Sequence, residues 1–172
     1  HPNQLYNNLF NNLKDEEKYL LFSLLRFDSF PIKEEWLMNS LQALKLNPIF
    51  DFQKSLKKLD GSWLTFKKES FDDDSMVDFF NPSIIDFLND KLKEYPKITE
   101  KITQNSIYLH QLCKGVDDYV LGKLNDSQNI FFSKLLANWN NFEDKDDFIG
   151  EKILAIIYLS QFSKFKDDFE GL

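Results

Sequence analysis

The stretch from Met76 to Leu92, MVDFFNPSIIDFLNDKL, changes from strand-forming residues to helical spacing within two positions. Its first five residues, MVDFF, include β-branched and aromatic side chains that favour a strand. Asn81 and Pro82 follow. An Asn side chain before a helix accepts hydrogen bonds from backbone N–H groups of the first turn, and Pro at the first helical position gives up no helical hydrogen bond. Beyond them the apolar residues recur with the period of a helix that buries one face: Ile84, Ile85, Phe87, Leu88 and Leu92. The stretch therefore predicts a strand that passes directly into a helix capped by Asn81.

A second aromatic-rich segment lies upstream of this junction. Ser62 to Phe66 has strand character, and the polar residues Lys67 to Ser75 connect it to Met76. Two short segments of this type around a polar loop are typical of a β-hairpin.

Three helices are predicted before the hairpin from the spacing of apolar residues, over Lys14 to Phe27, Ile32 to Leu46 and Ile49 to Leu59. The first of them is apolar almost all round, so we expect it to be central and buried. Asn47-Pro48 repeats the cap signature at the start of the third helix, and Asp60-Gly61 stops it.

This order of three helices, a hairpin and a further helix is the order of a winged-helix domain, whose hairpin forms the wing. We place the domain at about residues 15 to 95, after a short amphipathic helix over Gln4 to Leu13. Pro96 breaks the chain, and the later apolar stripes predict four more helices: Ile98 to Lys114, Val116 to Leu124, Ser127 to Trp139 and Asp147 to Phe169. We therefore expect a mainly α fold, with a winged-helix domain and two-stranded wing in residues 1–95 and an all-α segment of αα-hairpins in residues 96–172.

The composition favours a cytoplasmic globular protein. Of 172 residues 42% are hydrophobic, and a net charge of −7 disfavours binding to phosphate backbones and anionic membranes. One Cys excludes an intramolecular disulfide, and one Cys with two His excludes a zinc site of the usual Cys/His spacing. The longest wholly apolar run, Ile153 to Leu159, is too short to cross a bilayer, and no signal pattern opens the chain. Because residue 1 is His rather than Met, we expect a fragment of a longer protein.

A winged helix suggests DNA binding, and the third helix supplies candidate phosphate contacts: Gln53, Lys54, Lys57 and Lys58. That helix starts at Asp51 and has no Arg to read guanine. The wing carries only acidic charges toward its centre: Glu69, Asp72, Asp73 and Asp74. A phosphate backbone repels such a wing, so we expect a solvated helix face and a solvated loop.

Metal and catalytic chemistry find little support in the sequence. Asp72, Asp73 and Asp74 are successive residues of a turn, whose side chains point apart, and we expect no metal site there. His110 has no Ser, Cys or acidic neighbour in a triad-like context, and Cys113 lies among Leu residues as a small buried hydrophobe. No phosphate-binding loop is present. We expect no catalytic residue and no cofactor in this chain.

Three segments resemble the region that follows the NTPase core in bacterial STAND proteins, the signal-transduction ATPases with numerous domains. They are EEKYLLFSLLRFDSFPIKEEWL, FQKSLKKLDGSWL and VDFFNPSIIDFLNDKL, and FFNPSIIDFL is the most specific part. The later ITQNSIYLHQLCK resembles the start of the helical arm there, so the match covers about residues 5 to 115. The resemblance implies the same winged-helix domain that the order of elements predicts.

In animal and plant relatives of that family, the strand-to-helix step carries a Met-His-Asp motif whose His faces bound ADP. The resemblance puts Asn81 in the place of that His and Pro82 in the place of the Asp. Asn donates or accepts a hydrogen bond but does not ionise, which departs from the family pattern. Two interpretations of Asn81 stay open, a helix cap and a nucleotide-sensing residue, and a helix N-terminus is compatible with both.

The function implied by the resemblance is regulatory and non-catalytic. The chain would link an upstream NTPase domain to a downstream helical sensor, in prokaryotic antiviral defence or stress signalling, with ATP or ADP and oligomerisation belonging to the parent protein. No membrane and no nucleic acid are expected as partners. The alternative, of a different class, is a transcription-factor-like winged-helix module that binds DNA.

Overall fold

The computed structural model describes residues 2–27, 30–46, 51–67, 74–108 and 111. The chain divides into two compact units, His1–Ile102 and Thr103–Leu172. Most of the second unit lies outside the described residues, so the predicted division at residues 95 and 96 and the helices predicted after residue 115 stay predictions.

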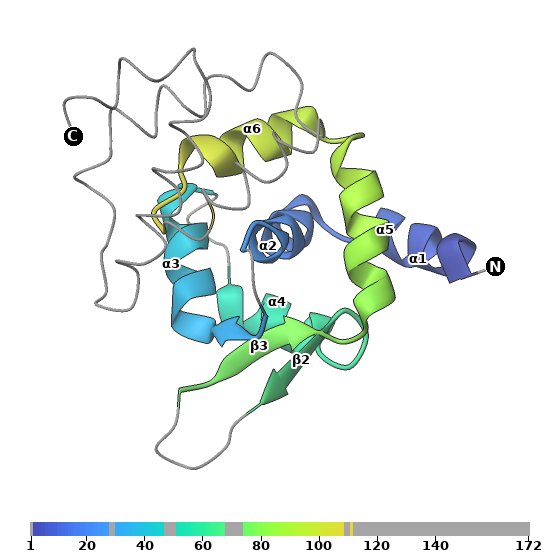
Figure 1. Ribbon diagram of the computed structural model, residues 1–172, viewed down its shortest axis with the longest axis horizontal. Helices are drawn as coiled ribbons and strands as arrows, with labels where there is room; N and C mark the ends of the chain where they lie inside the picture. Colours follow the sequence, from blue (N-terminus) through green and yellow to red (C-terminus); the bar gives the residue numbers. More distant parts are fainter. Residues whose placement is uncertain (1, 28–29, 47–50, 68–73, 109–110, 112–172) are drawn as a thin grey trace, which may run out of the picture. The chain divides into compact units, whose positions relative to one another are not determined.

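The described residues form a mainly helical fold with one small sheet, as the sequence predicted (Figure 1). In chain order the elements are α1 (Pro2–Asn11), α2 (Asp15–Leu25), β1 (Ile32–Lys33), α3 (Glu34–Ala43), α4 (Phe52–Leu59), β2 (Leu64–Lys67), β3 (Met76–Phe79), α5 (Pro82–Leu92) and α6 (Pro96–Gln104).

The sheet has three antiparallel strands in the order β1-β3-β2. The predicted hairpin is confirmed as β2 and β3, with Leu64 opposite Phe79. The prediction of only two strands is wrong, because Ile32 and Lys33, which we assigned to a helix, pair with Val77 and Met76 as a third strand. Two residues are too few to show a period of two in the sequence, so only the pairing with β3 reveals them as a strand.

Helix α2 is the centre of the first unit, and the prediction of a helix buried all round is confirmed. Every residue from Leu20 to Phe27, which covers the second half of α2 and the two residues after it, is at most 2% exposed. Figure 1 shows α2 between α3 and α5, above the sheet, and both helices contact it. Its first turn carries the acidic Asp15, Glu16 and Glu17, which favour the positive end of the helix dipole.

An aromatic cluster joins α1 to this core. Phe10 is fully buried, and its ring centroid lies 5.7 Å from that of Phe22 on α2 and 5.8 Å from that of Phe87 on α5. Trp63 and Tyr95 contribute further rings at 6.1 and 5.7 Å from Phe10. The predicted helix over Gln4 to Leu13 is confirmed as α1, shifted by two residues toward the N-terminus.

Two predicted helix boundaries are corrected. Helix α4 starts at Phe52, where the Asp51 carboxylate accepts a hydrogen bond of 2.9 Å from the backbone N–H of Lys54, so Asn47-Pro48 does not cap it. Residues 47–50 lie outside the described residues. The predicted stop is confirmed, since Asp60 ends α4 and Gly61 takes a φ of 70°, which favours glycine. Helix α6 ends at Gln104, which is short of the predicted end at Lys114.

We expect Leu24→Ala to lower the free energy of unfolding by about 2 to 5 kcal/mol, because Leu24 is fully buried on α2 and truncation leaves a cavity. Chemical denaturation measures the change. Leu5→Ala on α1 is the control, since Leu5 is 61% exposed and its truncation removes little buried surface. A loss below about 0.5 kcal/mol for Leu24→Ala would contradict the central position of α2.

Candidate functional site

The junction between β3 and α5 places Asn81 at the N-terminus of α5. Asn81 is the N-cap residue, with extended backbone angles of φ −156° and ψ 139°, and Pro82 is the first residue of the helix. The Asn81 Oδ1 accepts hydrogen bonds from the backbone N–H of Ser83 at 2.8 Å and from the Ser83 hydroxyl at 2.7 Å. The predicted cap is therefore confirmed in its geometry.

This junction lies on the surface and is held from two sides. The backbone N–H of Phe80 donates to the carbonyl of Trp63 at 3.0 Å, which ties the end of β3 to the turn before β2. The hydroxyls of Tyr6 and Ser83 share a hydrogen bond of 2.9 Å, which ties α1 to the start of α5. Asn81 itself is exposed, and the ring of Phe80 beside it is 54% exposed. The cap is thus accessible, with its Oδ1 already occupied by Ser83.

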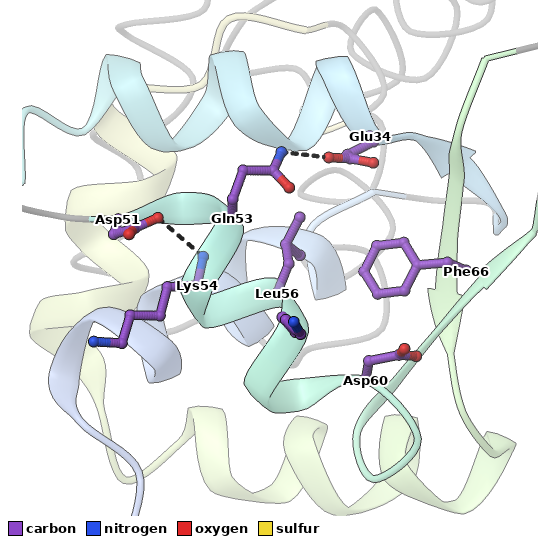
Figure 2. Close-up of a pocket in the computed structure, with 8 residues that line it drawn as sticks. Glu34, Asp51, Gln53, Lys54, Leu56, Asp60 and Phe66 are labelled. Carbon is purple, nitrogen blue, oxygen red and sulfur yellow. Dashed lines mark hydrogen bonds between the residues drawn. The ribbon is translucent and has the colours of Figure 1, made fainter.

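An open groove lies between α3, α4 and β2 (Figure 2). It has a volume of about 520 Å³ and a floor that includes Leu56 of α4 and Phe66 of β2. Polar and charged side chains of both signs line it above this floor: Glu34, Asp51, Gln53, Lys54, Lys57 and Asp60. Figure 2 shows a hydrogen bond across its upper edge, in which the Gln53 Nε2 donates to the Glu34 Oε1 at 2.8 Å.

The four residues predicted as candidate phosphate contacts on the third helix are all exposed. Gln53 is held by Glu34, and the Lys58 ammonium donates to both oxygens of Glu17, at 2.7 and 2.9 Å. The expectation of a solvated helix face is therefore confirmed, although Gln53 and Lys58 also bond to acidic residues distant in the sequence. Lys54 and Lys57 are exposed.

Glu17 is the polar residue that sequence reasoning missed. It is 3% exposed, and besides Lys58 it accepts a hydrogen bond of 2.9 Å from the backbone N–H of Lys14. A carboxylate in the third position of a helix that bonds back to the residue before the helix is a recognisable cap signal. The sequence carried only half of that signal, because Lys14 rather than Ser or Thr precedes the helix, and the ion pair to Lys58 joins residues 41 positions apart.

The other residues singled out in the sequence are placed only in part. The Lys33 ammonium lies 2.7 Å from the Asp74 carboxylate, so Asp74 faces β1. Glu69, Asp72, Asp73, His110 and Cys113 lie outside the described residues. Among the residues that are described, no three His, Cys, Asp or Glu side chains gather in a way that would hold a metal ion.

Among the groups in the described residues, the Tyr19 phenol has a clear pKa shift. The pKa of the Tyr19 phenol is raised above its ordinary value of 10.0, first because the ring is partly buried and second because the Asp15 carboxylate disfavours the phenolate. The Lys101 ammonium lies 5.5 Å from the centre of the same ring. A raised pKa keeps this phenol protonated at neutral pH, so it does not supply a base.

No protein-family model, no curated protein and no solved structure matches the chain. None of the helices in the described ranges has the length and apolar character that a bilayer crossing requires.

We expect Asn81→Ala to lower the free energy of unfolding by about 1 kcal/mol, because the N–H of Ser83 then loses its acceptor. Asn81→Asp and Asn81→Ser should retain stability, since both side chains are good caps. Chemical denaturation of the three variants measures this order. Equal stability of the Ala and Ser variants would show that the hydrogen bonds to Ser83 contribute nothing.

Proposed function

We propose that this chain is a non-catalytic regulatory piece of a STAND-type NTPase, which couples an upstream NTPase core to a downstream helical sensor in signalling or prokaryotic immune and stress responses. The observation that carries the proposal is the β3–α5 junction. There the segment FFNPSIIDFL, which resembles the family most specifically, supplies both a strand end and a capped helix start.

The order of elements supports a winged-helix identity for the first unit. Helices α2, α3 and α4 are followed by the β2–β3 hairpin and then by α5, which is the order on which that identity rests. Strand β1 lies in the segment between α2 and α3 and pairs with β3 of the hairpin. Because α3 begins directly after β1, this pairing holds the start of α3 against the hairpin. We expect a unit built in this way to move as one body, which the proposed coupling role requires.

A DNA-binding module is the competing proposal, and the charges on α4 count against it. Of its candidate contacts, Gln53 and Lys58 are held by Glu34 and Glu17. Lys54 and Lys57 remain exposed beside the carboxylates of Asp51 and Asp60. The affinity of a protein for DNA rises with the number of its cationic side chains that contact phosphates and release counterions. Two lysines that lie among acidic residues provide few such contacts.

The proposed role is to hold the NTPase core closed until a ligand arrives, so loosening this unit should release the core. In the intact parent protein we expect Leu24→Ala, which empties part of the α2 core, to speed nucleotide exchange in the absence of any ligand. Release of a fluorescent nucleotide analogue measures the rate, with Leu5→Ala on exposed α1 as the matched control. Equal exchange in both variants, or an intact protein that binds no nucleotide, would contradict the proposal.

The contribution of Asn81 to nucleotide sensing has its own test in the intact protein. Asp and Ser both cap a helix, but only Asp brings a negative charge toward a phosphate. Because the Asn81 Oδ1 is already used for the cap, we expect Asn81→Asp and Asn81→Ser to have equal nucleotide affinity and equal basal activity. Weaker affinity in the Asp variant alone would instead assign Asn81 a phosphate contact. Asp51→Asn, at the cap of α4, controls for the charge change at a helix start.

A further inference from the structure

The groove beside α4 continues past the hydrogen bond between Gln53 and Glu34. A second hollow of about 240 Å³ adjoins it, because the same two residues line both. The second hollow is lined on its far side by Met38 of α3 and by Asp74 and Ser75 before β3. We call the two hollows together the α4 groove. Its lining comes from the end of β1, from α3, α4 and β2, and from the residues just before β3.

The floor of the α4 groove is apolar. Leu56 is buried, and Phe66 and Met38 are half-buried, so each presents part of an apolar side chain to the opening. The larger hollow has a volume within the range of about 300 to 1,000 Å³ that accepts ligands or large side chains. One aromatic or long aliphatic side chain of a partner would cover this floor.

The charge on the α4 groove is predominantly acidic. Among the described residues, five carboxylates line it: Glu34, Glu35, Asp51, Asp60 and Asp74. Three lysines line it as well, and one of them, Lys33, is paired with Asp74 at 2.7 Å. The whole chain has a net charge of −7, so the long-range field adds to this local excess. A cationic partner complements the local acidic charge and the negative net charge of the chain, whereas a polyanion complements neither.

A two-fold contact between the α4 helices of two copies is disfavoured by charge. A two-fold contact centred on an antiparallel pair of α4 helices places Lys54 near Lys57 and Asp51 near Asp60 of the copy, since the four residues are arranged symmetrically along the helix. A parallel pair places each residue near itself. Like charges face each other in both cases and destabilise the contact. We therefore take the partner to be a different polypeptide.

We propose that the α4 groove docks a basic amphipathic peptide segment of a partner protein, which seats one large apolar side chain over Phe66 and places Lys or Arg against Glu34 and Asp60. Helical and extended segments both bind grooves of this kind through one or a few apolar anchors. Lys54 and Lys57 repel a cationic partner. Reversing their charge should therefore strengthen binding, which can be tested. The proposal does not depend on the function proposed above.

The test is fluorescence anisotropy of short labelled peptides that carry one Trp among several Lys at varied spacing, titrated with the full chain. We expect saturable binding of at least one of them, and none when Glu replaces each Lys. Glu34→Gln with Asp60→Asn should weaken binding about threefold to tenfold, the size expected for exposed charge pairs. Gln at position 34 still offers an oxygen to Gln53, so the groove keeps its shape. Asp90→Asn on the exposed side of α5 is the matched control and should leave binding unchanged.

The double variant Lys54→Glu with Lys57→Glu separates the proposal from its rivals. A basic peptide should bind this variant about threefold to tenfold more tightly, because two repulsive charges become attractive. Weaker peptide binding by this variant would overturn the proposal, and so would the absence of saturable binding by every Lys-rich peptide. Binding of a short DNA duplex that this variant abolishes would overturn it in favour of nucleic acid. Circular dichroism of each variant verifies that the chain remains folded.

Discussion

The complete burial of α2 is the constraint on which the first unit depends. A helix that is apolar on every side after its first turn must be covered on every side, and one neighbouring helix covers only one stripe of it. Helices α3 and α5 contact α2 directly, and the sheet lies below it (Figure 1). Each of these elements is amphipathic or short, so each needs α2 to cover its apolar side chains. The fold is therefore cooperative around Leu20 to Phe27.

The N-terminal turn of α2 is stabilised by an ion pair instead of by apolar packing. Glu17 is nearly inaccessible, and a buried carboxylate is costly unless hydrogen bonds and an opposite charge compensate it. The backbone N–H of Lys14 and the ammonium of Lys58 provide both. This pair ties α4 to the start of α2, while the Lys58 side chain itself stays half exposed.

The short helix α4 contributes both to the core and to the groove, and Leu56 belongs to both. Leu56 and Leu59 of α4 are buried, whereas Asp51, Lys54 and Lys57 face solvent. In a DNA-binding winged helix the corresponding exposed side reads the major groove. Here the exposed side carries opposite charges at close spacing above an apolar floor, which is typical of a surface for protein partners. The coupling role proposed above needs such a surface, and the Asn81 junction at the start of α5 is a separate feature with its own hydrogen bonds.

The sequence by itself determined what depends on neighbouring residues. The buried period of α2, the stop at Asp60-Gly61 and the cap at Asn81 are local signals, because each needs only a few consecutive side chains and the backbone beside them. The tertiary structure alone decided what depends on distant residues. Ile32 becomes a strand only beside Val77, and Lys58, whose side chain is still half exposed, pairs with a buried Glu17 that lies 41 positions away. The groove likewise exists only because α3, α4 and β2 meet around Phe66, and no local pattern encodes a meeting of three segments.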